Sequence, residues 1–292
     1  MEKSRNLWAI GAMLLAVALF ALMDTGLKLL SPHYPAVQVA ALRALSSLPL
    51  VCAYVAWRGA FGTLLKIRWP LHLLRGVLGI GMLACFAYGL RHLPLAEAYS
   101  IFFVAPMLIT ALSVPLLKER VDGARWLAIF VGLGGVLVVL RPTGAGLLTL
   151  GGLAVIAAAA CYALSSVMVG IISRTDSIES MVFWLMVMVA LGAGAVAAPN
   201  WVTVRFEHAW ILIGIAITGF IGQIAITEAF KRGEASAIAP FEYSALAWGM
   251  GLDWLLWQTL PDGYTLLGAA IIIASGIYLL RRERVHVECE HP

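Results

Sequence analysis

Two charged residues stand four positions apart in an otherwise apolar stretch near the N-terminus, Asp24 and Lys28. This spacing places both side chains on one face of a helix, with the acidic residue first, the order that favours an ion pair. Arg43 lies in the next apolar stretch, roughly 10 Å from its end at 1.5 Å per residue, and Asp24 lies at a similar depth. A charge inside a membrane costs about 2.5–3.5 kcal/mol on insertion scales, so such residues have partners or duties. Two roles are open: a clasp between helices, or a gate on the path of a solute.

Two glutamates occupy later apolar stretches, Glu228 and Glu242, and both have Lys231 and Arg232 nearby in the sequence. Static ion pairs with these cations are the first interpretation. The second is proton binding, because burial favours the neutral form of a carboxyl group.

Rings interleaved with hydroxyl and amide groups fill the middle of several stretches. Aromatic residues of membrane proteins gather mostly at the two interfaces, whereas a mid-membrane set suggests a largely apolar pocket with a few orienting polar groups. The candidates for the cavity wall are Phe20, Tyr88, Tyr99, Phe103, Tyr162, Ser166, Gln223, Thr227, Tyr243 and Trp248. Lys28 and Arg43 are the only cations expected inside the membrane, and both are expected to be shallow. The pocket therefore favours a neutral or zwitterionic solute, whose ammonium group the rings can attract, over a phosphorylated one.

Ten apolar stretches must position these residues. Hydrophobic residues make up 62% of the 292-residue chain and charged residues 12%, about half the share typical of soluble domains. Because a spanning helix needs about 20 mostly apolar residues, the pattern predicts an all-α polytopic membrane protein with ten transmembrane helices. They are expected over residues 8–30, 36–57, 70–90, 96–117, 124–140, 148–172, 179–198, 208–230, 236–257 and 264–280.

The basic residues predict the orientation of these helices. With both termini in the cytoplasm, fifteen Lys and Arg residues fall on or near the inner side, whereas Arg91, Arg141 and Arg205 alone fall outside. This agrees with the retention of basic residues in cytoplasmic loops. The cations form no continuous face, so no nucleic-acid partner is expected, and the N-terminal run is read as a permanent helix rather than a signal peptide.

The last five stretches repeat the first five. Residues 88–141 align with 228–281 at an offset of 140, and Asp122-Gly123 then falls on Asp262-Gly263. Near the start of each half the offset is 142, which places Phe20 on Tyr162. Because five is odd, the two units insert in opposite orientations, as in many transporters. We assign the repeats to residues 1–143 and 144–292.

This organisation resembles the drug/metabolite transporter superfamily, and its EamA-type domain in particular. The resemblance rests on Pro106, on the run Leu117-Lys118-Glu119-Arg120 and on the glycine-rich segment 132–135, and it extends over the whole chain. The second half departs from it, since Gln258-Thr259 replaces Lys118-Glu119. The resemblance implies alternating access, with a cavity lined by the third, fourth, eighth and ninth helices and contributions from the first and sixth. Pro106 would then be a hinge or a fixed bend.

Among such proteins, the chain looks most similar to bacterial inner-membrane exporters of neutral and aromatic amino acids. We therefore expect a secondary transporter that binds a small solute within the lipid bilayer. Transport of another metabolite or drug is one alternative, and an intramembrane lipid-modifying enzyme or a channel is another. The chain carries no recognisable catalytic motif, and its four cysteines have no metal-ligand spacing. No enzyme activity, cofactor or metal is expected, and the sequence leaves the oligomeric state open, with a monomer as one option.

Overall fold

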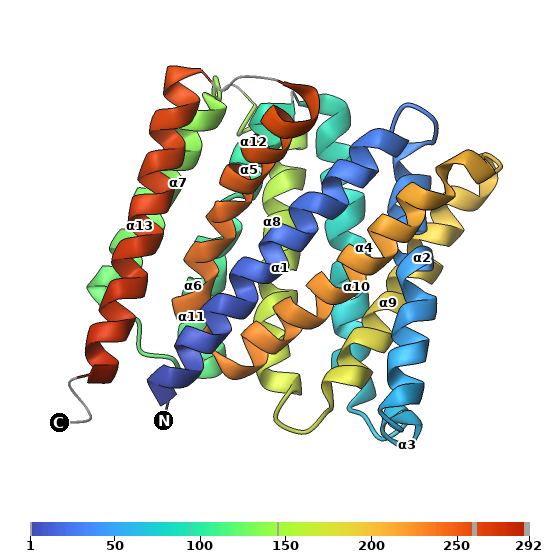
Figure 1. Ribbon diagram of the computed structural model, residues 1–292, viewed down its shortest axis with the longest axis horizontal. Coiled ribbons are helices and arrows are strands. Elements are labelled where there is room, and N and C mark those ends of the chain that lie inside the picture. Colours follow the sequence, from blue (N-terminus) through green and yellow to red (C-terminus); the bar gives the residue numbers. More distant parts are fainter. Residues whose placement is uncertain (1, 94, 145, 259–261, 289–292) are drawn as a thin grey trace.

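The computed structural model describes residues 2–93, 95–144, 146–258 and 262–288, and its secondary structure there is helical throughout (Figure 1). The helices of the first half are α1 Glu2–Leu30, α2 Ala36–Trp57, α3 Phe61–Leu64, α4 Trp69–His92, α5 Leu95–Phe102, α6 Ala105–Leu117 and α7 Gly123–Leu140. Those of the second half are α8 Leu150–Ile172, α9 Ile178–Ala197, η1 Ala198–Asn200, η2 Phe206–His208, α10 Ala209–Arg232, α11 Ala235–Ile238, η3 Ala239–Tyr243, α12 Ser244–Trp257 and α13 Gly263–Glu288. The chain is an all-helical membrane protein.

Nine helical spans within the described residues are long and apolar enough to cross a membrane. The predicted fourth span is divided into α5 and α6, although Glu97–Leu117 still qualifies as one span. The predicted ninth span is divided into α11, η3 and α12, and none of these segments is long enough alone. The predicted ninth span, which brings the number of crossings from nine to ten, is therefore present as a broken helix.

The two broken spans are interrupted at equivalent positions. The first break falls at Phe103 and Val104, and the second is η3, which ends at Tyr243, 140 residues after Phe103. Pro106 stands in the first turn of α6 and Pro240 in the first turn of η3, where the missing N–H of proline costs no helical hydrogen bond. The two prolines do not stand at equivalent positions of the repeat, yet the two helix breaks do.

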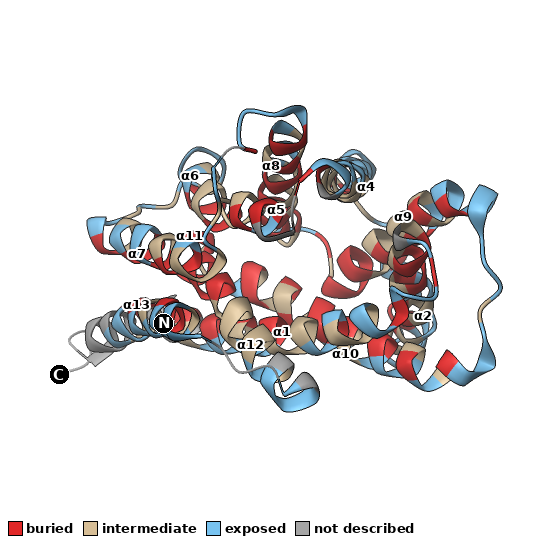
Figure 2. Ribbon diagram, turned by 90° about the horizontal axis from the view of Figure 1, so that it is seen from above, coloured by how far each residue is buried: buried red, intermediate tan, exposed pale blue. Residues whose placement is uncertain are grey.

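Helix packing follows the duplication. α1 packs on α10 as α8 packs on α4, and α12 lies on α1 as α6 lies on α8. α7 pairs with α13 at one end of the elongated molecule, whereas α2 pairs with α9 at the other (Figure 2). Each pairing joins the two halves, so neither half has a core of its own. α1 begins and α13 ends at the same face (Figure 1); we call it the terminal face and the opposite one the distal face.

Equivalent loops are tied together at both faces. At the distal face, the Tyr34 hydroxyl lies 2.7 Å from Nδ1 of His208. At the terminal face, the Asp176 carboxylate lies 2.8 Å from Nε2 of His72, and Asp176 is 142 residues after Tyr34. Burial opposes ionisation of Asp176, but hydrogen bonds from Thr175, the Arg68 backbone and His72 outweigh it and lower the pKa of this carboxyl.

The repeated Asp-Gly pairs are helix caps. Asp122 accepts a hydrogen bond from the Arg125 backbone N–H at 3.0 Å at the start of α7, and Asp262 accepts one from the Thr265 N–H at 2.9 Å at the start of α13. Each cap satisfies one of the free N–H groups of a helix start. The chain reaches both caps through a residue in the left-handed region, Lys118 at φ 61° and Gln258 at φ 53°.

Glycines bring α7 and α13 into close contact. A Cβ atom on Gly268 would lie 2.6 Å from the carbonyl oxygen of Gly135, and one on Gly135 would lie 2.9 Å from that of Gly268. Gly132 is covered by the Tyr243 ring and Gly276 lies beside Phe241. These glycines serve helix packing, as is usual between helices in lipid.

Candidate functional site

Rings and charges from α1, α2, α5 and α8 meet near the middle of the molecule. The guanidinium of Arg43 lies over the Phe20 ring, 5.6 Å from its centroid. Arg43 is within electrostatic range of Asp24 and of Tyr162, which stands near the middle of α8. Tyr99 of α5 is likewise close to Asp24. We call Phe20, Asp24, Arg43, Tyr99 and Tyr162 the central group.

Arg43 was expected to be shallow, and this expectation needs correction. Its Cα lies within two turns of the start of α2, but its side chain reaches the mid-helix residues Phe20 and Tyr162. The long stem of arginine allows its charged head to lie far from its backbone. The centre of the molecule therefore holds a cation with a nearby carboxylate.

Asp24 is exposed even though Arg43 and Tyr99 approach it from two other helices. The Asp24 carboxylate therefore stays accessible while Arg43 compensates its charge. Lys28 is exposed one turn further along α1.

Tyr162 links the central group to Glu242. Its hydroxyl donates a hydrogen bond to Oε1 of Glu242 at 3.0 Å, and the Ser166 side chain lies beside it. Glu242 is 8% exposed. It has no ion-pair partner among the residues that the structure describes, so the expected pair with Lys231 or Arg232 is not formed.

Glu228 does form a predicted ion pair. Its carboxylate lies 2.5 Å from Nε of Arg232, one turn along α10, and Arg232 also lies over the Trp8 ring. The pair stands at the terminal-face end of α10, and neither of its residues belongs to the central group. It is a surface contact of the kind worth at most about 1 kcal/mol.

The remaining predicted wall residues divide into two sets. Tyr99, Tyr88 and Trp248 are between 40% and 48% exposed; Tyr88 stacks on His92 near the end of α4, with ring centroids 4.3 Å apart. The ring centroids of Phe103 and Tyr243 are 6.1 Å apart, and Tyr243 is fully buried against α7. The structure thus places Tyr243 in the packing core, because the glycine opposite leaves room for its ring.

The polar residues of α10 are buried within the helix bundle. The Thr227 hydroxyl donates to the Gln223 carbonyl oxygen at 2.7 Å, and the Gln223 amide lies 3.5 Å from the same hydroxyl. Neighbouring Gly222 lies against the Phe20 ring. Gln223 therefore follows directly, in the sequence, a residue that contacts the central group. Thr227 is enclosed, with 0% exposure. Pro106 is also buried, at the start of α6.

A polar network closes the terminal face. The two carboxylate oxygens of Glu119 accept hydrogen bonds at 2.7 and 2.9 Å from successive backbone N–H groups at the start of α11. Arg125 binds Glu234 at 2.5 Å and the Ser236 hydroxyl at 3.0 Å, and Asn6 holds Glu234 at both its backbone and its carboxylate. We call these five residues the terminal latch. It joins α1 and the α6–α7 turn to the hinge before η3.

The charges of the latch are not repeated at the equivalent positions of the other half, and the distal face is joined instead by the ion pair of Arg141 with Asp262. The repeat offsets place Leu148 opposite Asn6, Thr259 opposite Glu119 and Thr265 opposite Arg125. None of these three side chains can form an ion pair. Burial follows the same division: residues 235–243 are all buried, whereas no described residue of α12 beyond them is.

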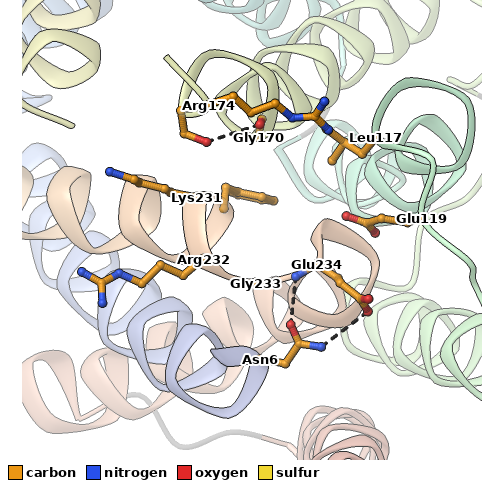
Figure 3. A pocket seen from close by; sticks show the side chains of 11 residues that line it. Asn6, Leu117, Glu119, Gly170, Arg174, Lys231, Arg232, Gly233 and Glu234 are labelled. Atoms are coloured by element: carbon orange, nitrogen blue, oxygen red, sulfur yellow. Dashed lines mark hydrogen bonds between the residues drawn. The ribbon is translucent and has the colours of Figure 1, made fainter. Parts of the chain in front are cut away.

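A cavity of about 340 Å³ opens beside the latch at the terminal face. Figure 3 shows Glu119 and Glu234 on one side of it, and Arg174 and Lys231 on the other. Residues of both halves line it, from α1, α6, α8 and α10.

Two buried basic residues escaped the sequence reasoning. Arg75 is 4% exposed in α4 and donates from Nη1 to the Met181 carbonyl oxygen at 3.2 Å. His72 is 2% exposed. Arg75 is one of the fifteen basic residues expected on or near the inner side. It lies instead within the apolar span Trp69–Gly89, so Lys28 and Arg43 are not the only cations in such spans. Its position two turns into the helix was the available signal.

The family model described as the EamA-like transporter family matches residues 7–141 and 149–282, once in each half. The chain belongs to the EamA-like transporter family. Its members are transporters, and the membership sets the intramembrane enzyme aside.

Curated relatives cover nearly the whole chain. A pseudopaline exporter of Pseudomonas aeruginosa is 26% identical over 92% of this chain and 95% of its own. A riboflavin transporter of Vibrio cholerae is 28% identical over 93% of this chain and 92% of its own. An S-adenosylmethionine uptake transporter of Rickettsia conorii is 27% identical over 98% of this chain and 96% of its own. A solved crystal structure matches with a TM-score of 0.80 at 22% identity, covering 94% of this chain and 96% of that one. The chain is therefore a multi-pass transporter of small metabolites with the fold of that structure.

Proposed function

We propose that this transporter exports neutral or zwitterionic amino acids, aromatic ones included, through the central group. The observation that carries the proposal is Arg43 held over the Phe20 ring with Asp24 within electrostatic range. A zwitterion needs opposite charges a few ångströms apart, and an aromatic side chain needs rings beside them.

The solute fits this arrangement in one orientation. Its carboxylate binds the Arg43 guanidinium, and its ammonium faces Asp24. Its side chain lies among Phe20, Tyr99 and Tyr162, with Trp248 and Gln223 further along the wall. The doubly charged phosphate of a phosphorylated sugar has no matching cluster of cations here, because Arg75 is turned toward α9.

The relatives support a ring-bearing solute without naming one for this chain. S-adenosylmethionine, the solute of one relative, is an amino acid with an aromatic ring system, and riboflavin, the solute of another, is also aromatic. Other metabolites of these kinds are the alternatives that the experiment below separates.

The latch supports the proposal that the solute moves by alternating access. With the terminal face closed by charged contacts, the central group is reached from the distal face; breaking the latch and closing the distal end reverses the access. We place the terminal face in the cytoplasm of an inner membrane, on the basis of the basic residues. The two repeat units then run over residues 1–143 and 144–292.

The test is uptake into proteoliposomes that contain the purified protein. Labelled phenylalanine and tryptophan are expected to enter saturably and to exchange with unlabelled solute, whereas a sugar phosphate is not. Replacement of Tyr99 or Trp248 by alanine should raise the KM for phenylalanine about 3–10-fold, because an aromatic contact contributes about 0.5–1.5 kcal/mol. Trp201→Ala, in the loop after α9, is the matched control and should leave KM unchanged. Transport of riboflavin, S-adenosylmethionine or a sugar phosphate without any amino acid would refute the assignment.

A further inference from the structure

Glu242 differs from three other acidic residues of the helix bundle in having no cation beside it among the described residues. Glu228 is paired with Arg232, Glu234 with Arg125, and Asp24 lies within range of Arg43. Glu242 is nearly as buried as the core, and its hydrogen-bond partner is the neutral hydroxyl of Tyr162.

No described neighbour supplies the missing positive charge. η3 packs against α1, α6, α7, α11, α12 and α13. Arg125 of α7 is held by Glu234 and Ser236, and the titratable groups that face Glu242 are Tyr162 and Tyr243. A carboxylate without a cation is expensive to bury, so such a group takes up a proton instead.

Glu242 is joined to both moving parts of the transporter. Through Tyr162 it touches the central group, since that tyrosine also lies within range of Arg43. Through η3 it continues into α11, whose first N–H groups are capped by Glu119 of the latch. A change of charge at Glu242 therefore acts on the solute site and on the hinge together.

We propose that Glu242 is the proton-carrying residue that makes this protein a proton–solute antiporter. In the empty site its carboxyl group holds a proton. The ammonium group of an entering solute supplies the missing positive charge, the O–H bond of Glu242 breaks, and the proton leaves to the water of the open cavity. When the solute departs, Glu242 takes a proton from the side then open. This inference rests on the proposed amino-acid function for the identity of the cation.

The test compares Glu242→Gln with Glu228→Gln in proteoliposomes. In the wild type and in Glu228→Gln, an acidic interior should drive accumulation of labelled phenylalanine. In Glu242→Gln this accumulation should fall at least tenfold, and the phenylalanine exchange that remains should not vary with pH, because glutamine cannot release a proton. Accumulation in Glu242→Gln that equals the wild type would overturn the proposal.

A second measurement needs no solute. Infrared difference spectra of the purified protein across a pH titration should contain the carbonyl band of a protonated carboxylic acid. The band should be lost in Glu242→Gln, retained in Glu228→Gln, and titrate at a different pH in Tyr162→Phe, which keeps the carboxyl but removes its hydrogen bond. If phenylalanine is not transported at all, the proposed function fails and this band decides the proton-carrying role alone. A wild-type protein without the band, or a band that persists in Glu242→Gln, overturns the inference.

Discussion

At the scale of single residues, Arg43 is the side chain that defines the central group. It is the cation that contacts a mid-membrane ring, and it lies between the carboxylate of Asp24 and the hydroxyl of Tyr162. A guanidinium in this setting retains strong attraction for a carboxylate, because few waters compete with it. The clasp between helices and the solute site, both open from the sequence, are compatible here: Asp24 compensates Arg43 while the site is empty.

Replacement of Arg43 by glutamine should weaken binding of solutes that carry a carboxylate. A hydrogen bond to a charged group contributes about 1.5–3 kcal/mol, which corresponds to a rise in KM of about tenfold to a hundredfold for phenylalanine. Phenylalanine amide lacks the carboxylate, so its inhibition constant for the transport that remains should be nearly the same in both proteins. An equal loss for the amide and the amino acid would show that Arg43 acts only in helix packing.

At the scale of elements, the broken fourth span (α5 and α6) and ninth span (α11, η3 and α12) lie at the candidate site. The glycine-rich fifth and tenth spans, α7 and α13, pack against each other as unbroken helices. The breaks at Phe103 and at η3 face each other through the Phe103 and Tyr243 rings. Short helical segments shift more readily than one continuous helix, since hydrogen bonds are already interrupted between them. The pairing of α7 with α13 relies on close backbone contact, and η3 packs against both of these helices.

Replacement of Gly268 by alanine should separate α7 from α13. The added methyl would meet the Gly135 carbonyl oxygen at 2.6 Å and the Val139 backbone nitrogen at 3.0 Å, and backbone atoms cannot rotate away. Overpacking of this kind lowers the free energy of unfolding by about 1–3 kcal/mol. The lower melting temperature would be measured in detergent. Gly134→Ala, with open space at its Cβ, should melt at the wild-type temperature or slightly above it; equal losses in both variants would contradict the packing argument.

At the scale of the whole molecule, duplication gives two faces with equivalent backbone but unequal chemistry. The terminal face carries the latch, whereas the equivalent positions at the distal face are leucine and threonine and the distal ion pair joins Arg141 to Asp262 instead. Ion pairs and charge-assisted hydrogen bonds favour the state in which they form, so the latch stabilises a state in which the terminal face is closed. For an exporter with cytoplasmic termini, the solute must then open the latch from the inside before it is moved.

The orientation itself is tested by cysteine labelling in intact cells. In a variant whose native cysteines are replaced by serine, Leu148→Cys should react with an impermeant reagent from outside, because Leu148 is 88% exposed at the distal face. Phe61→Cys, 60% exposed in α3 at the terminal face (Figure 1), should react only after the cells are permeabilised. The reverse pattern would place the termini outside.

The sequence by itself determined the membrane class, the repeated halves and most helix ends, because apolar length and period are local properties that a bilayer imposes on each span. The repeated Asp-Gly pairs and the glycine-rich segment 132–135 were also visible in the sequence, because each acts within one turn or one helix face, but only the structure shows that the aspartates cap α7 and α13. The tertiary structure decided the rest. Only the packing of α2 against α10 and α1 carries Arg43 to Phe20 and within range of Tyr162. Only the register of α7 against η3 buries Tyr243, and only the meeting of α1, α7 and α11 assembles the latch. Those contacts join residues far apart in the chain, and their geometry depends on how helices pack rather than on any spacing along the sequence.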